Sequence, residues 1–303
     1  MAAKTGWTGI YPAVTTILND DESVDLDGTA RHADFLIKSG VHGVIMLGSV
    51  GENMSLDAGE KRAVLEKTVE SVNGRVPVLS GVAESSTAAA CRFAADAEAI
   101  GADGLMVLPP MVYKTDEGET MRHYRKVASN TELPIMCYNN PVSYGVDITP
   151  EMFAALADVA NLTTIKESSE NTRRLTDIAN LCGDRYDLFC GVDDLIVESV
   201  ALGVKGWVAG FVNALPQEAV RLWNLATSSR WDEARALYAW FAPLMHLAEA
   251  GKLVQHIKLA QSIVGVGPET TRAPRLRLEG DERARVTAII RAALDARPKL
   301  AAE

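Results

Sequence analysis

The chain has 303 residues, of which 48% are hydrophobic and 23% are charged, a balance typical of folded globular proteins rather than disordered chains. Forty acidic and 30 basic residues give it a formal net charge of −10. Because an acidic chain repels phosphate backbones, we expect no nucleic-acid partner.

Eight short apolar segments recur along the first two thirds of the chain and predict β-strands. Most are continuous apolar runs, as expected for strands that are covered on both faces. In chain order they are Gly9–Ile17, His42–Leu47, Val76–Gly81, Gly104–Leu108, Pro134–Tyr138, Thr163–Lys166, Tyr186–Cys190 and Gly206–Gly210.

Amphipathic segments between these strands predict helices. Leu56–Val72 follows Ser55, a suitable N-cap, and has Glu60 near its first turn. Thr87–Ile100 stops at Gly101, where glycine favours helix termination. A further helix is predicted at Asn171–Cys182. After the eighth strand, only helices are predicted: Pro216–Ala226, Trp231–Leu247, Leu253–Val264 and Glu282–Leu294.

The alternation of strands and helices at intervals of about 25–30 residues indicates parallel βαβ units. Eight such units match a closed (β/α)8 TIM barrel. An open doubly wound α/β sheet shows the same alternation, but its GxGxxG phosphate-binding motif is absent. We therefore predict a TIM barrel over residues 1–214, with the last barrel helix and a C-terminal helical extension packed on the barrel over residues 215–303.

Several functional classes are disfavoured by what the sequence lacks. No apolar run reaches the roughly 18–20 residues that span a membrane, and the first residues lack the apolar stretch of a secretion signal. The histidines show no HxH or HExxH spacing, so we predict no metal site. Four cysteines without a CxxC pair fit reduced thiols in a cytoplasmic protein: Cys91, Cys137, Cys182 and Cys190.

Lys166 is the strongest candidate for a catalytic residue. It ends the sixth predicted strand, and active sites of TIM barrels lie at the carboxyl ends of the strands. Burial there disfavours the charged ammonium and lowers its pKa. A neutral amine attacks a carbonyl or imine carbon and forms a Schiff base. The alternative is a solvated lysine that pairs with Glu167.

Two further strand ends carry candidate residues. Tyr138 ends the fifth strand, and its phenol is suited to proton transfer at a Schiff base, although a core tyrosine is the simpler interpretation. Ser49 and Val50 lie in a glycine-flanked turn after the second strand, where backbone N–H groups can bind a substrate carboxylate. For Asp193 and Asp194, a helix N-terminus is favoured over a metal site.

Taken together, these segments resemble the dihydrodipicolinate synthase/N-acetylneuraminate lyase family of class I aldolase-type barrels. The resemblance covers about residues 8 to 295 and rests on four segments: Gly48-Ser49-Val50-Gly51-Glu52, Tyr138-Asn139-Asn140-Pro141, Ile165-Lys166-Glu167-Ser168 and Gly191-Val192-Asp193-Asp194.

The resemblance implies roles for individual residues. Lys166 corresponds to the lysine that forms a Schiff base with a 2-oxo acid, and Tyr138 to the tyrosine that relays protons. Ser49 and Val50 correspond to the loop that holds the substrate carboxylate. By the same correspondence, the remaining positions of the substrate-binding site are Ser143, Gly191 and Val208. No metal or organic cofactor is expected, and family resemblance suggests a homodimer or homotetramer.

Three features depart from the synthase pattern. Ser143 replaces the arginine that binds the carboxylate of the synthase's second substrate. Ser49-Val50 stands where the synthase has Thr-Thr, and Met111 aligns with its second relay tyrosine, with Tyr113 two residues further on. These departures disfavour lysine biosynthesis.

Longer stretches resemble the branch of 1-pyrroline-4-hydroxy-2-carboxylate deaminases, which act in hydroxyproline degradation. They are Leu47-Gly48-Ser49-Val50-Gly51-Glu52-Asn53, Gly81-Val82-Ala83-Glu84, Asn171-Thr172-Arg173-Arg174 and Gly206-Trp207-Val208-Ala209-Gly210.

Three hypotheses follow from the sequence. The first is a Schiff-base deaminase that releases ammonia and 2,5-dioxopentanoate. The second is dihydrodipicolinate synthase or another 2-oxo acid aldolase or dehydratase of the same family. The third is a non-catalytic barrel, which predicts loss of Lys166 or Tyr138; both are present.

Overall fold

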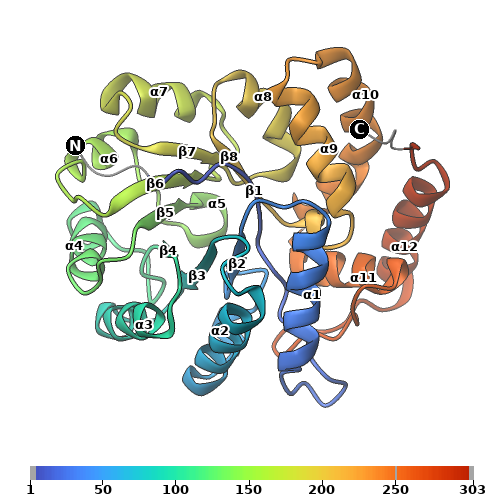
Figure 1. Cartoon of the computed structure of the whole chain (residues 1–303), viewed down its shortest axis with the longest axis horizontal. Coiled ribbons are helices and arrows are strands. Elements are labelled where there is room, and N and C mark those ends of the chain that lie inside the picture. The colour runs from blue at the N-terminus through green and yellow to red at the C-terminus, as the bar shows by residue number, and fades with distance from the viewer. Residues whose placement is uncertain (1–4, 250, 300–303) are drawn as a thin grey trace.

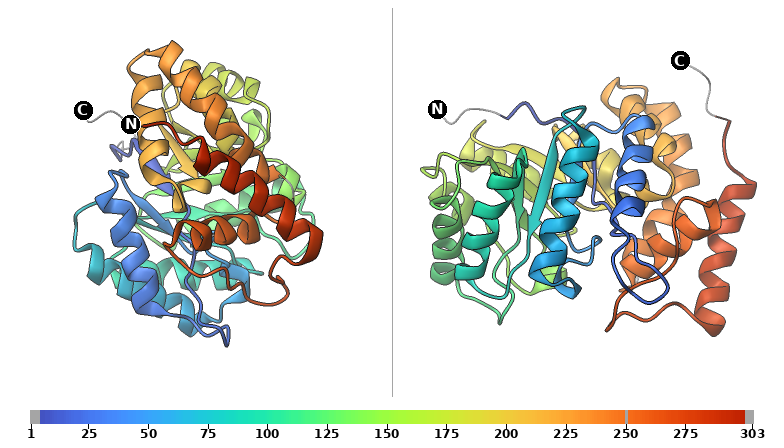
Figure 2. Two further views of the ribbon diagram at one scale, coloured as in Figure 1. Left: turned by 90° about the vertical axis from the view of Figure 1, so that its right-hand side faces the viewer. Right: turned by 60° about the horizontal axis from the view of Figure 1, so that its bottom comes forward.

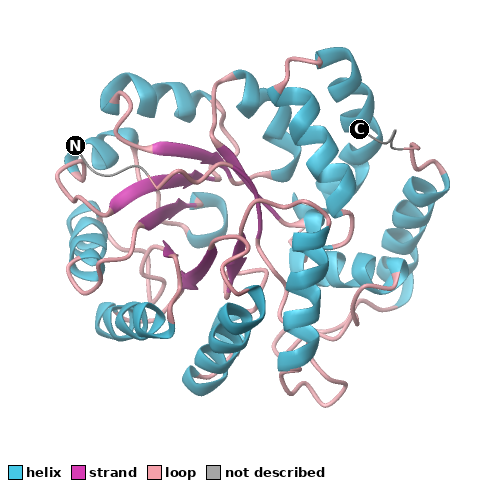
Figure 3. Cartoon of the chain, in the orientation of Figure 1, coloured by secondary structure: helices cyan, strands magenta, loops and turns pink. Residues whose placement is uncertain are grey.

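Eight parallel strands form the centre of the molecule, and helices surround them (Figures 1 and 3). The structure is a computed structural model that describes residues 5–249 and 251–299. The strands follow one another around the sheet in chain order, and β1 pairs with β8. They are β1 (Gly9–Pro12), β2 (Val44–Met46), β3 (Val78–Val82), β4 (Gly104–Val107), β5 (Ile135–Asn139), β6 (Leu162–Glu167), β7 (Asp187–Cys190) and β8 (Gly206–Ala209).

The sheet closes between β1 and β2 through single backbone contacts rather than a continuous ladder. Ala13 forms a parallel bridge with Ile45, and the Val14 N–H donates to the Ile45 carbonyl at 2.9 Å. The predicted TIM barrel is therefore confirmed. Each of the eight predicted strands is found, although β1 is shorter than the predicted Gly9–Ile17.

The helices that follow the strands cover the outside of the barrel (Figure 3). Helix α2 begins two residues later than predicted, because Asp57 rather than Ser55 is its N-cap and forms a capping box with Glu60. Helix α3 has the predicted bounds. The outer helices are α1 (Leu26–Lys38), α2 (Ala58–Val72), α3 (Thr87–Ile100), α4 (Glu117–Ala128), α6 (Pro150–Ala155), α7 (Arg173–Cys182), α8 (Ile196–Ala201) and α9 (Pro216–Thr227). The single turn α5 (Pro141–Tyr144), directly after β5, lies over the strands instead (Figure 1).

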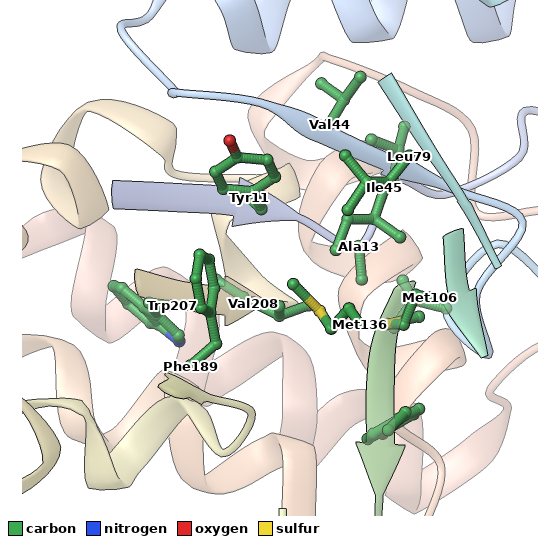
Figure 4. Packing of buried hydrophobic residues seen from close by; sticks show 14 of the residues in the cluster. Tyr11, Ala13, Val44, Ile45, Leu79, Met106, Met136, Phe189, Trp207 and Val208 are labelled. Atoms are coloured by element: carbon green, nitrogen blue, oxygen red, sulfur yellow. The ribbon is translucent and has the colours of Figure 1, made fainter. Parts of the chain in front are cut away.

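Large side chains fill the inside of the barrel where glycines leave room for them. The rings of Tyr11 and Phe189 meet edge-on with their centroids 5.6 Å apart, and Figure 4 shows both close together between the strands. A Cβ atom at Gly43 would overlap the Tyr11 ring, and one at Gly206 would overlap the Phe189 ring. The barrel is thus a packed core rather than a channel.

The C-terminal helices pack along one side of the barrel (Figure 2). They are α10 (Trp231–Met245), α11 (Leu253–Val264) and α12 (Gly280–Asp295). Trp240 joins two of them, because its indole N–H donates to the Ala293 carbonyl at 2.8 Å. Buried Lys258 of α11 pairs with Glu52, which follows β2, at 2.6 Å. The extension therefore contacts the barrel close to the carboxyl ends of its strands.

Within the described ranges, no helix has the length and apolar character needed to cross a membrane.

Candidate active site

A cavity of about 470 Å³ opens at the carboxyl ends of the strands. The structure brings every sequence-predicted site residue to this one cavity, although these residues come from five different strands or the loops after them. They are Ser49, Val50, Tyr138, Ser143, Lys166, Gly191 and Val208. This placement follows from parallel strands, whose carboxyl ends all meet at one end of the barrel.

Lys166 lies near the end of β6, with only 5% of its surface exposed. Strand pairing places it beside Tyr138 of β5, and its Nζ atom lies 3.7 Å from the centre of the Tyr138 ring. Burial lowers the pKa of Lys166 from its ordinary value of 10.5 to about 7, while the nearby charge of Asp193 opposes this shift. The amine is therefore available in its neutral, nucleophilic form near neutral pH.

Gly191, directly after β7, makes room for this lysine. A Cβ atom at residue 191 would overlap the Ser168 hydroxyl and lie 2.8 Å from Cε of Lys166. In the structure, the absence of a side chain at Gly191 therefore leaves space for the side chain of Lys166.

Tyr138 presents a protonated phenol to the same cavity. Burial raises the pKa of Tyr138 above its ordinary value, although a hydrogen bond from Asn140 opposes the increase. The Asn140 amide donates to the Tyr138 hydroxyl oxygen at 3.1 Å. Tyr138 thus retains its proton at neutral pH, as a general acid requires.

The turn after β2 is held by side chains on both sides. The Thr16 hydroxyl donates to the Gly51 carbonyl at 2.7 Å, and the Asn53 amide donates to the Leu47 carbonyl at 2.8 Å. Ser49 and Val50, between these anchors, line the cavity. The turn is therefore a fixed part of the cavity wall.

The carboxylate of Asp193 binds the loop after β8 rather than its own helix N-terminus, which the sequence favours. Asp193 begins a short 3₁₀ turn, but its buried carboxylate accepts hydrogen bonds from the Trp207 indole at 3.1 Å and from the backbone N–H groups of Gly210 and Phe211. It thereby fixes the loop after β8 and puts a negative charge near Lys166. The sequence prediction missed this because these partners lie 14 to 18 residues away.

The cavity has little positive charge. Lys166 is the single cationic side chain among the described residues that line it, and Glu170 and Asp193 are acidic. Ser143 contributes a neutral hydroxyl to the wall. No cluster of three or more potential metal-ligating side chains occurs in the described part of the chain.

Tyr144 is a site residue that the sequence prediction missed. Its hydroxyl forms a short hydrogen bond with the Ser49 hydroxyl, and its ring meets the Tyr138 ring edge-on, with the centroids 5.7 Å apart. A tyrosine six residues after Tyr138 was the available signal. By contrast, Tyr113 is 57% exposed and donates to Glu119 at 2.6 Å.

A parallel barrel with a buried lysine beside a tyrosine defines a class I, Schiff-base-forming type of site. The sequence matches the Dihydrodipicolinate synthetase family over residues 6–293. The protein belongs to this family, and thus to the class I aldolases and lyases.

Individual relatives agree with this assignment. The chain is 34% identical to a 4-hydroxy-tetrahydrodipicolinate synthase of Methanococcus vannielii, over 88% of this chain and 91% of the relative. A crystal structure of a dihydrodipicolinate synthetase-like protein from Pseudomonas aeruginosa is 30% identical, with a TM-score of 0.90, and covers 95% of this chain and 100% of its own.

A third relative is a prophage protein of the same family from E. coli K12, whose structure was solved in complex with pyruvate. It is 29% identical, with a TM-score of 0.89, and covers 95% of this chain and 99% of its own. None of these three is described as a deaminase. The relatives therefore support the second sequence-based hypothesis, a synthase or aldolase, better than the first.

Proposed function

We propose that the protein is a lyase in which Lys166 forms a Schiff base with C2 of a small 2-oxo acid or 2-carboxy imine. The observation that carries this proposal is the buried Lys166 amine with a pKa near 7, 3.7 Å from the Tyr138 ring. A protonated imine withdraws electrons from C3, so that a C3 proton, a β-hydroxyl or a carbon–carbon bond can be lost without another cofactor.

The substrate carboxylate is proposed to bind at the Ser49–Val50 turn. Both residues line the cavity, and no backbone carbonyl among the described residues accepts a hydrogen bond from either backbone N–H. Two such groups on a rigid turn suit a carboxylate, because donors to an anion form stronger bonds than neutral pairs do.

Tyr138 is proposed to transfer the protons of Schiff-base formation. Neutral Lys166 forms an N–C bond to C2, and the former carbonyl oxygen takes a proton from the Tyr138 hydroxyl. The amine nitrogen then returns a proton to the Tyr138 phenolate. In the last step the Tyr138 hydroxyl gives this proton to the carbinolamine hydroxyl, which leaves as water. The phenolate must finally recover one proton from solvent, because the product imine is protonated.

The first candidate reaction uses one substrate with one carboxylate. Ser143 and the shortage of positive charge around the cavity favour it, since a second carboxylate would find no cationic partner. The proposed substrate is 1-pyrroline-4-hydroxy-2-carboxylate. Attack by Lys166 opens its ring and leaves a free amine on C5, and the C3 proton and the 4-hydroxyl are then lost as water. Tautomerisation converts the C5 amine into a second imine, and hydrolysis of both imines takes up two waters to give 2,5-dioxopentanoate and ammonia.

The second candidate is carbon–carbon bond formation or cleavage, as in a 4-hydroxy-tetrahydrodipicolinate synthase. The 34% identity to a protein of that name over most of both chains favours it.

Two measurements test these proposals. Borohydride reduction in the presence of pyruvate should add mass at Lys166 and nowhere else, and labelling at another residue would contradict the Schiff-base assignment. A substrate panel, assayed for ammonia, dehydration and aldol products, separates the candidates. Efficient condensation of pyruvate with aspartate semialdehyde, without ammonia release from the pyrroline, would support the synthase instead.

A further inference from the structure

A pair of hydrogen-bonded hydroxyls lies beside Tyr138. The Ser49 and Tyr144 hydroxyls bond to each other, although the residues are 95 positions apart. The Tyr144 ring stands at 86° to the Tyr138 ring, with 5.7 Å between centroids. Ser49 and Tyr138 both line the cavity, so that Tyr144 connects two parts of its wall.

The local sequence holds Tyr144 in this position. Pro141 begins the single helical turn α5, and the Asn140 side chain caps it by accepting a hydrogen bond from the Ser143 N–H at 2.9 Å. The same Asn140 side chain donates to the Tyr138 hydroxyl. Gly145 then ends the turn with a positive φ of 70°, a conformation that glycine adopts without strain. Tyr138 and Tyr144 are thus oriented by one shared residue.

The pair also connects a buried group to solvent. Tyr138 is buried, whereas Ser49 and Tyr144 are partly exposed. Desolvation raises the pKa of Tyr144 well above its ordinary value, so that its hydroxyl stays protonated. These are the properties of a group that returns protons to a buried phenolate.

Met111 and Tyr113, at and near the position of the second relay tyrosine in the synthase pattern, do not offer this connection. Met111 has no proton to transfer. Tyr113 is mostly exposed, and its hydroxyl donates to Glu119.

We propose that Tyr144, together with Ser49, returns protons from solvent to Tyr138, so that the proton relay of the active site is completed within one chain. The inference rests on the Schiff-base chemistry proposed above. In each step the Tyr138 phenolate takes the Tyr144 proton. Tyr144 takes one from water, or from the Ser49 hydroxyl, which at the same time takes one from water. No oxidant, reductant or further reactant enters. Tyr144 acts through Tyr138 and is therefore a positioning and relay residue.

Pyruvate is a suitable probe, because its Schiff base forms an enamine that exchanges the methyl protons with solvent. The exchange in D₂O, followed by NMR, measures proton transfer. Borohydride trapping at Lys166 separately measures imine formation and shows that the site is folded. Tyr144→Phe removes only the hydroxyl, and Ser49→Ala removes the same hydrogen bond from its other end. Tyr113→Phe is the matched control, since it deletes a tyrosine hydroxyl outside the cavity.

We expect Tyr144→Phe to be trapped by borohydride to the wild-type extent but to exchange the methyl protons about 10²-fold more slowly, the lower end of the range for acid–base transfer. Tyr113→Phe should exchange normally. We expect Ser49→Ala to slow exchange as well, and the double variant to be no slower than the slower single variant, because both act in one relay.

Four results would overturn the relay. Three concern the variants: normal exchange in Tyr144→Phe, slow exchange in Tyr113→Phe alone, and multiplicative effects in the double variant. The fourth is wild-type protein that is trapped without exchanging its methyl protons. Absence of trapping in the wild type would instead refute the proposed Schiff-base function itself.

Discussion

Lys166 is the proposed nucleophile, and its surroundings rather than its residue type set its protonation state. Burial lowers its pKa to about 7, so the neutral fraction increases as the pH rises through that value. We predict that kcat/KM increases with pH and levels off above an apparent pKa near 7. The rate of borohydride trapping by pyruvate, measured between pH 5 and 9, should show the same dependence.

Replacement of Asp193 provides the control for this pH dependence. Because the Asp193 charge favours the protonated lysine, Asp193→Asn should move the acid limb of the profile to lower pH. A rate that continues to rise up to the ordinary lysine pKa would contradict the assigned role of Lys166.

The hydroxyl of Tyr138 is the proposed proton donor of the same site. Tyr138→Phe keeps the ring beside Lys166 and removes only the proton donor. We predict a decrease in kcat of about 10²–10⁴-fold with little change in KM. Steady-state kinetics check this, and an unchanged kcat with a raised KM would assign the hydroxyl to substrate binding instead.

At the scale of the elements, glycines in the strands determine which rings fit inside the barrel. A Cβ atom on Gly206 of β8 would overlap the Phe189 ring of β7. We predict that Gly206→Ala destabilises the fold by about 1–3 kcal/mol, as overpacking does. Thermal unfolding measures the effect.

Gly118 is the matched control for this substitution. It is exposed in α4, and a Cβ atom there meets its nearest neighbour at 3.5 Å. Gly118→Ala should leave stability unchanged or increase it by up to about 1 kcal/mol. Adding Phe189→Leu to Gly206→Ala should recover part of the loss. No recovery would exclude the ring overlap as its cause.

Element boundaries were predicted as well as local signals allow. Helix α3 matches its prediction, because Ser86 and Gly101 are both caps in the structure. The start of α2 was wrong, because Ser55, Leu56 and Asp57 lie close together and all precede the apolar pattern. The choice of Asp57 depends on its capping box with Glu60 and on the 3₁₀ turn Asn53–Ser55.

At the scale of the whole molecule, a buried ion pair joins the C-terminal extension to the barrel. Lys258 is fully buried in α11, and its Nζ lies 2.6 Å from the Glu52 carboxylate and 2.8 Å from the Thr270 carbonyl. Lys258→Met would leave the charge of the buried Glu52 carboxylate balanced by the more distant Arg275 guanidinium, 3.8 Å away. We predict that it lowers the free energy of unfolding by about 3 kcal/mol, at the low end for a broken buried pair.

Lys252→Met provides the comparison, since Lys252 pairs with Glu282 at the surface. This substitution should lower the free energy of unfolding by less than about 1 kcal/mol. Thermal unfolding of both variants tests the difference. Adding Glu52→Gln to Lys258→Met should restore part of the stability, because it removes the uncompensated charge. Equal effects of Lys258→Met and Lys252→Met would contradict the role of the buried pair.

The sequence by itself determined the barrel and the two central residues of its candidate site. Apolar runs and turn residues are local signals, and eight of them in alternation with helices specify parallel strands. Once the strands are parallel, residues that end them must meet at one end of the barrel. Lys166 and Tyr138 therefore come together without any knowledge of side-chain contacts.

Only the tertiary structure decided which side chains complete the cavity and hold it in place. The Ser49–Tyr144 hydrogen bond joins residues 95 positions apart, and the Glu52–Lys258 pair joins residues 206 positions apart. The carboxylate of Asp193 turned away from its own helix terminus toward the loop after β8. Such contacts depend on how side chains are oriented by distant elements, and periodicity along the chain carries no information about that orientation.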